Sequence, residues 1–258
     1  MTIFIFCYIY IMIVVTMTSW SKRIKNVLPI ICNIFRGVIK PDRLYLNLSI
    51  QEFPHMEKEL PQDLVEYCSL NGSVIINWVE GENTKTMKKV FPILKYLDDD
   101  DIIITCDDDI LINPYLIKSR INDIRKYNYR YAISSSSMWK FINNSYTLSA
   151  TSIYTKRMFN NWEKLYTDEV VKTYNDDMLY TYILWLNGVC VLPCTKYDVW
   201  HQKNFNGVEG AFETSLFLMS EEFDKVILPV IKSITGTDDI KKCFGYFKYD
   251  CNSYDILG

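Results

Sequence analysis

Short apolar runs alternate with segments of helical spacing along the first 110 residues of the chain. The apolar runs are rich in β-branched residues and bounded by polar or turn residues, which predicts buried strands at residues 11–16, 44–48, 74–79 and 102–105. Between them, apolar residues recur every three to four positions, which predicts helices at residues 22–36, 61–70 and 86–96. Strand–helix alternation of this kind predicts an α/β fold, with a mostly parallel, Rossmann-like sheet covered by helices on both faces.

Turn and capping residues define the expected ends of these elements. Ser21 is the expected N-cap of the first helix and Gly37 its stop, while Pro29 and Pro92 are expected to kink or interrupt their helices. In the second half we expect a helix-like segment at 114–126, a helix that begins near Asp176 and ends at Asn187–Gly188, and a strand at 189–192. No internal repeat or linker divides the chain, so a single domain over residues 11–258 is expected after an apolar extension of residues 1–10.

The first 17 residues allow two interpretations. Residues 3–17 are apolar except Thr16, but this run is shorter than the roughly 18 residues that a membrane span needs. No basic segment precedes the run and no small-residue cleavage site follows it. We therefore favour a buried strand over a membrane anchor. Lys22, Arg23 and Lys25 follow the run, so even an anchored protein would keep its body in the cytosol, and a cytoplasmic location is expected.

Composition excludes several classes of protein. The 258 residues are 49% hydrophobic and 23% charged, as in globular proteins and unlike disordered or multi-span membrane chains. A net charge of −3 argues against a nucleic-acid partner, which would need a basic field. The eight cysteines contain no Cys-x-x-Cys and no zinc-type spacing. Cys32, Cys106 and Cys190 lie within apolar runs and are expected to be small buried hydrophobic residues.

Two acidic clusters flank the strand expected at 102–105. Asp98 to Asp101 precede it and are most simply a solvated turn. Asp107, Asp108 and Asp109 follow it, where ligands bind in open α/β sheets. In an extended segment Asp107 and Asp109 would point to one side and Asp108 to the other. Crowded carboxylates repel one another and need a cation or hydrogen-bond donors to neutralise them. Mn²⁺ or Mg²⁺ suits oxygen ligands and could bridge a diphosphate.

Three stretches together resemble the GT-A-fold glycosyltransferases, especially bacterial and large-virus enzymes of the polysaccharide type. They are residues 16–24 (TMTSWSKRI), 40–46 (KPDRLYL) and 100–110 (DDIIITCDDDI), and the resemblance covers about residues 11–202. It implies a metal-dependent transfer of a sugar from a nucleotide-sugar donor to a hydroxyl of a glycan or similar acceptor. Residues 11–110 would form the nucleotide-binding half, and residues 111–258 the acceptor half and C-terminal tail.

The resemblance also assigns donor-binding residues. Those that would contact the nucleotide or lie near the donor are Thr16, Thr18, Ser19, Arg23 and either Lys88 or Lys89. Asp107 and Asp109 match the Asp-x-Asp that binds metal and diphosphate, and Asp108 would lie near the sugar. The segment 146–154 departs from the family pattern because it has no glycine, which would alter how closely the donor sugar or the acceptor can approach.

Two later motifs complete the expected site. Asp176 and Asp177 look like the acidic pair that opens a helix facing the acceptor. In inverting members of the family, an acid at this place serves as the general base. Inversion of the anomeric configuration is mildly preferred over retention. The residue types of Asp176 and Asp177 alone equally suit a helix first turn, where the macrodipole favours acids. His201 resembles the late histidine that completes the metal shell, although a lone histidine is more often a surface or core residue.

Two other functions remain open from the sequence. Asp107 and Asp109 could serve a phosphohydrolase or nuclease, which would release phosphate or cleave nucleic acid without a sugar acceptor. A catalytically inactive, glycosyltransferase-like binding protein is the third possibility, suggested by the apolar N-terminus and the missing glycines. Donor sugar, acceptor and oligomeric state are not determined by any of these motifs.

Overall fold

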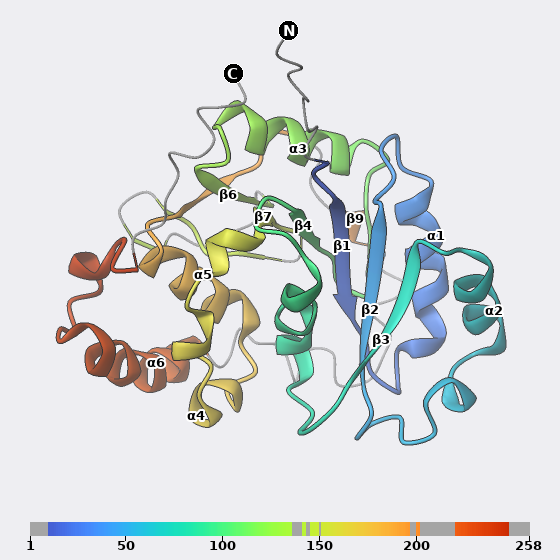
Figure 1. Cartoon of the computed structure of the whole chain (residues 1–258), viewed down its shortest axis with the longest axis horizontal. Coiled ribbons are helices and arrows are strands. Elements are labelled where there is room, and N and C mark those ends of the chain that lie inside the picture. Colours follow the sequence, from blue (N-terminus) through green and yellow to red (C-terminus); the bar gives the residue numbers. More distant parts are fainter. Residues whose placement is uncertain are drawn as a thin grey trace, which may run out of the picture.

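A seven-stranded mixed sheet organises the molecule (Figure 1). The computed structural model describes residues 10–135, 141–142, 145–149, 151–196, 200–201 and 220–247. In spatial order the strands are β3 (Val74–Val79), β2 (Arg43–Ser49), β1 (Ile13–Thr18), β4 (Ile102–Thr105), β7 (Ile153–Thr155), β6 (Tyr131–Ser134) and β8 (Cys190–Pro193). All neighbours pair in parallel except β7, which is antiparallel to β4 and β6. The predicted mostly parallel α/β fold is confirmed.

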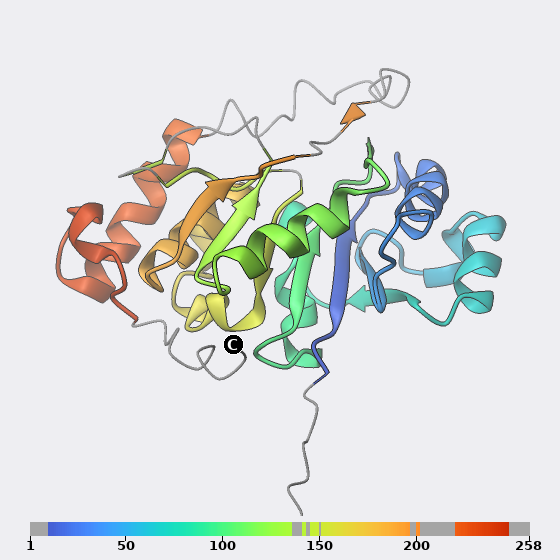
Figure 2. The ribbon, with the colours of Figure 1, turned by 90° about the horizontal axis from the view of Figure 1, so that it is seen from above.

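Helices cover both faces of this sheet, and α3 and α5 lie on opposite sides of it (Figure 2). The α-helices are α1 (Val27–Phe35), α2 (Gln62–Leu70), α3 (Leu116–Lys126), α4 (Asp168–Val171), α5 (Asp176–Leu186) and α6 (Ser220–Thr235). Short 3₁₀ helices connect them: η1 (Ile24–Asn26), η2 (Met56–Glu59), η3 (Lys85–Lys89), η4 (Phe91–Tyr96), η5 (Lys156–Phe159), η6 (Trp162–Lys164) and η8 (Ile240–Cys243). No helix in the described ranges is both long and apolar enough to cross a bilayer.

The central strands confirm most of the apolar pattern. The strands predicted at 74–79 and 102–105 have those bounds in the structure, and Ile102, Ile103 and Ile104 are completely buried. The strand predicted at 11–16 is β1, which begins two residues later and pairs on both sides, with β2 and β4. Its place between two partner strands accounts for the apolar residues of β1 itself. Residues 1–9 lie outside the described residues.

The predicted helices differ from the structure around both prolines. The helix expected at 22–36 begins as η1 and becomes α1 only at Val27, so Pro29 lies in its first turn, where a missing N–H costs nothing. Asn26, not Ser21, holds the N-cap position. The helix expected at 86–96 is two 3₁₀ helices, η3 and η4, and Pro92 lies at the start of the second. A proline in the first turn loses no hydrogen bond within the helix, so η4 can begin there.

The first acidic cluster is only partly the solvated turn that was expected. Asp98 and Asp99 are exposed, but Asp101 is 3% exposed and accepts hydrogen bonds from the backbone N–H groups of Met12 and Asp98, at 2.9 and 2.8 Å. Asp101 therefore ties the start of β1 to the turn before β4. The cysteines also differ in part: Cys106 is buried, whereas Cys32 and Cys190 are half-buried.

Candidate functional site

The carboxyl ends of β1 and β4 lie side by side and carry most of the predicted site. Thr16 of β1 pairs with Thr105 of β4, so the residues after each strand leave the same edge of the sheet. Ser19 and Arg23 follow β1, and the acidic segment Asp107–Asp109 follows β4. Open α/β sheets bind their ligands at this edge.

Lys89 joins two acidic groups that are far apart in the sequence. Its Nζ lies 2.8 Å from Oδ1 of Asp107 and 2.8 Å from Oδ2 of Asp176, the first residue of α5. Burial by itself would lower the pKa of Lys89, but the charges of Asp107, Asp176 and Asp177 outweigh it and raise that pKa well above its ordinary value. Lys89 therefore carries a fixed positive charge between the loop after β4 and the helix α5.

Polar residues inside the central strands hold Lys89 in place. The hydroxyl of Thr16 donates to the backbone carbonyl of Lys89, and the side-chain amide of Asn47 donates to that hydroxyl at 2.9 Å. Thr16 and Asn47 are both completely buried. Thr16 therefore holds the backbone of Lys89 through its hydroxyl. A direct contact between Thr16 and a nucleotide stays a prediction. Asn47 was missed from the sequence, although an amide within the apolar segment 44–48 was the available signal.

Lys88 and Lys89 have different surroundings, which the sequence could not distinguish. The ammonium group of Lys88 bonds to Oδ1 of Asn83, and Asn83 donates to Glu52 at 3.0 Å. Burial lowers the pKa of Lys88 to about 8. Of the two lysines, Lys89 is the one paired with the acidic residues at the carboxyl ends of the strands.

Arg23 neutralises the other part of the acidic segment. Its NH1 lies 2.9 Å from Oδ1 of Asp108 and 2.8 Å from Oδ2 of Asp109. Ser19 donates to the second oxygen of Asp108 at 2.5 Å. Burial raises the pKa of Asp108, and the contacts with Ser19 and Arg23 oppose this rise. The expected alternation of the three acids does not hold, because Asp108 and Asp109 lie in a turn and share one guanidinium.

Asp176 and Asp177 occupy the first turn of α5, as the helix pattern predicted. Asn175 is the N-cap, and its side chain accepts from the N–H of Met178 at 3.1 Å. Asp176 is completely buried, whereas Asp177 is half-buried. Desolvation and the neighbouring charge of Asp176 raise the pKa of Asp177 well above its ordinary value, although Lys89 opposes them. The two acids therefore differ in how accessible they are to solvent.

His201 lies near the acidic segment through its backbone. In the small antiparallel sheet of β5 (Ile110–Leu111) and β9 (Trp200–His201), His201 pairs with Ile110, the residue after Asp109. The side chain of His201 lies outside the described part of the chain. Among the side chains that are described, no three His, Cys, Asp or Glu groups gather as a metal site requires.

Further hydroxyl groups lie at the carboxyl end of β6. The Oγ atoms of Ser134 and Ser152 are 2.8 Å apart, and Ser134 Oγ lies 3.2 Å from Ser149 Oγ. Ser152 also donates its backbone N–H to Thr105, the last residue of β4, at 3.1 Å.

Thr18, predicted to contact the nucleotide, contacts the neighbouring strand β2, where its hydroxyl donates to the carbonyl of Asn47 at 2.8 Å.

Comparison with solved structures identifies the fold. The chain superposes on S. aureus TarS 1–349 in complex with UDP-GlcNAc with a TM-score of 0.52 at 13% identity, covering 90% of this chain and 69% of that one. The mannosyltransferase PcManGT from Pyrobaculum calidifontis, in complex with GDP-Man and Mn²⁺, matches with a TM-score of 0.54 at 10% identity, over 95% of this chain and 72% of that one. The chain has the GT-A glycosyltransferase fold.

The likeness is confined to the fold. The ligand-free TarS 1–349 structure matches with a TM-score of 0.51 at 12% identity, and the chain spans 66% of its length. It spans 41% of the longer TarS structure. No protein-family model and no curated protein sequence matches the chain. At identities this low, the structural likeness shows the GT-A fold alone. The donor, the acceptor and the reaction must be argued from the residues of the site.

Proposed function

We propose that the protein is a metal-dependent glycosyltransferase that moves a sugar from a nucleotide-sugar donor to an acceptor hydroxyl, with inversion at the anomeric carbon. The observation that carries this proposal is the pair of contacts from Lys89, at 2.8 Å each, to Asp107 on the donor side and Asp176 on the acceptor side. In a GT-A fold this pairing brings together the two acidic motifs that a transferase needs. A phosphohydrolase would not require the second motif.

The donor side offers oxygen ligands for a divalent ion. The ion pairs engage Oδ1 of Asp107 and Oδ2 of Asp109, one oxygen of each carboxylate, and these side chains are 30% and 24% exposed. Accessible carboxylate oxygens suit Mn²⁺ or Mg²⁺, so the donor set fits such an ion. Asp107 and Asp109, with His201, would hold it, and when bound it supplies positive charge for the departing nucleoside diphosphate.

Arg23 and Lys89 complement that charge. Both side chains already lie against the acidic segment, and the positive charge of Lys89 is fixed by three neighbouring carboxylates. Cations held in place by the fold stabilise charge that develops on a leaving group without reorganisation. Ser19, Arg23 and Lys89 would thus orient the diphosphate, with Asp108 fixed between Ser19 and Arg23.

The two acids at the start of α5 would have different roles on the acceptor side of the site. Asp176 is completely buried and paired with Lys89, so it cannot reach an acceptor and instead positions the lysine. Asp177 is half-buried and has a raised pKa, as suits a general base. The acceptor oxygen forms a bond to the anomeric carbon as the bond from that carbon to the diphosphate breaks, and the acceptor proton passes to Asp177.

An assay of nucleoside diphosphate release tests the proposal. The protein is incubated with a panel of UDP- and GDP-sugars, with and without Mn²⁺, and the released diphosphate is measured. We expect metal-dependent release that Asp109→Asn reduces by about 100-fold or more, as loss of a group that stabilises developing charge does. The matched variant Asp99→Asn, at an exposed position at the other end of β4, should leave it unchanged. Release of inorganic phosphate, or equal activity in both variants, would contradict the proposal.

A further inference from the structure

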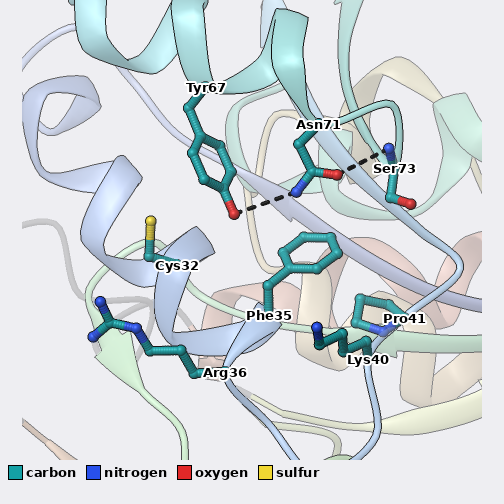
Figure 3. A pocket seen from close by; sticks show the side chains of 8 residues that line it. All are labelled: Cys32, Phe35, Arg36, Lys40, Pro41, Tyr67, Asn71 and Ser73. Carbon is teal, nitrogen blue, oxygen red and sulfur yellow. Dashed lines mark hydrogen bonds between the residues drawn. The ribbon is translucent and has the colours of Figure 1, made fainter.

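A cavity of about 500 Å³ lies between α1 and α2, and none of the candidate site residues lines it (Figure 3). The end of α1 contributes Cys32, Phe35 and Arg36, the following loop contributes Lys40, and α2 and the residues after it contribute Tyr67 and Asn71. Volumes of this size accommodate small molecules.

The cavity and the acidic site lie at opposite ends of the strands. Pro41 and Ser73, which also line the cavity, come just before β2 and β3, at the amino ends of these parallel strands. Asp107 and the residues around it follow the carboxyl end of β4. A ligand in the cavity would therefore not be the donor or the acceptor of the transfer, and its binding is independent of the proposed function.

Charge indicates what kind of ligand the cavity would take. Among the described residues no acidic side chain lines it, although the chain as a whole carries a net charge of −3. Arg36 and Lys40 are exposed, and neither forms an ion pair with any residue in the described ranges. The carboxyl ends of α1 and α2 each contribute roughly half a negative charge, which is less than the two full positive charges of these side chains. A net positive field remains.

The remaining walls are aromatic and polar, and they are held in place. The amide nitrogen of Asn71 donates to the hydroxyl of Tyr67 at 3.3 Å, and the backbone N–H of Ser73 donates to the amide oxygen of Asn71 at 3.1 Å. Figure 3 shows Tyr67 and Asn71 across the cavity from Arg36 and Lys40, with the ring of Phe35 between them. A ligand with an anionic group and a flat or apolar part matches this arrangement.

We propose that this cavity binds a phosphate monoester, whose doubly charged group lies on the side of the cavity that Arg36 and Lys40 line and whose organic part lies against Phe35 and Tyr67. Guanidinium and ammonium groups are the side chains that proteins use for phosphate, and arginine can bind it through two parallel hydrogen bonds. Free phosphate monoesters and the headgroup of phosphatidic acid share this chemistry. A volume of about 500 Å³ favours the free molecule.

Calorimetric titration with phenyl phosphate tests the proposal. The wild-type chain should bind it, and the double variant Arg36→Gln/Lys40→Gln should weaken binding by about tenfold or more, since both charge-assisted contacts are lost. Lys118→Gln, an exposed lysine on α3, should leave binding unchanged and serves as the matched control. Both substituted residues are exposed, so the double variant should unfold at the wild-type temperature and retain any nucleotide-sugar activity.

Vesicles identify the source of the phosphate group. If the wild-type chain sediments with vesicles of phosphatidylcholine containing phosphatidic acid, and the double variant does not, the site binds a lipid headgroup. If the wild-type chain binds phenyl phosphate but not the vesicles, the site binds a free molecule. If the double variant weakens neither phenyl phosphate binding nor vesicle binding, or if the wild-type chain binds neither probe, the proposal is wrong.

Discussion

Lys89 Nζ lies 2.8 Å from Asp176 Oδ2 in a contact that is almost entirely buried: the side chain of Lys89 is 8% exposed and that of Asp176 is 1% exposed. This pair links the connection between β3 and β4 to the first turn of α5. Both groups would be costly to bury alone, because a charge removed from water needs a partner. The pair therefore explains why an acidic residue can occupy a completely buried position in the candidate site.

Replacement of Lys89 by methionine should destabilise the protein by about 3 kcal/mol, because Asp176 would remain buried without its partner. Urea denaturation followed by circular dichroism measures the loss. The double variant Lys89→Met/Asp176→Asn should recover part of it, since the uncompensated carboxylate is removed. A Lys89→Met protein as stable as the wild type would show that the ion pair does not hold this region together.

The raised pKa of Asp177 predicts how stability depends on pH. The folded state favours the protonated carboxyl group, so this contribution to the free energy of unfolding is fully present below the ordinary aspartate pKa. It is lost as pH rises from that value through the raised pKa of the folded protein. The difference in free energy of unfolding between wild type and Asp177→Asn should therefore change over this window. The wild type should become less stable relative to the variant as pH rises.

The same residue should also control the rate. A general base must be deprotonated, so kcat/KM should rise with pH around an apparent pKa above that of an ordinary carboxyl group. Asp177→Asn should remove most of the activity while binding the donor nucleotide as well as the wild type does. A variant that keeps both its activity and the pH profile would exclude Asp177 as the base.

Asp101 should matter for stability and not for activity. Its carboxylate accepts from the N–H groups of Met12 and Asp98, and Asp101→Ala would leave two N–H groups of the structure without this partner, at a cost of about 2 kcal/mol. Asp98→Ala, at an exposed neighbouring position, should cost little. Thermal unfolding of the two variants, with an activity assay at low temperature, checks both statements; an inactive but stable Asp101→Ala protein would contradict them.

The four strands of the first half of the chain were predictable because they are local patterns, whereas β6 and β7 were not predicted. The runs at 74–79 and 102–105 are apolar, β-branched and bounded by polar residues, and they need no long-range information to be recognised. The segment 86–96 was not predictable in the same way. Apolar spacing does not separate a 3₁₀ from an α-helix. Lys89, the residue before the break at Val90, also has a long-range contact with Thr16 of β1 that no local pattern shows.

The sequence indicated candidate residues for the site but not how these residues pair with one another. Residue type and the carboxyl ends of strands indicated Asp107, Asp109 and Asp176, but which of Lys88 and Lys89 faces them depends on the turn of η3. Asp101 likewise could not be told from Asp98, because its partner Met12 is 89 residues away in the chain. Such pairings are properties of the packed structure.

Titration of a nucleoside diphosphate by calorimetry, with and without Mn²⁺, tests whether Asp107 and Asp109 hold a divalent ion for the donor. We expect Mn²⁺ to tighten binding of UDP or GDP by about tenfold or more in the wild-type protein, because the ion would supply positive charge for the diphosphate. No such effect is expected in Asp107→Asn/Asp109→Asn. Affinity that is the same with and without Mn²⁺, or a double variant that responds to Mn²⁺ like the wild type, would contradict this role of the two carboxylates.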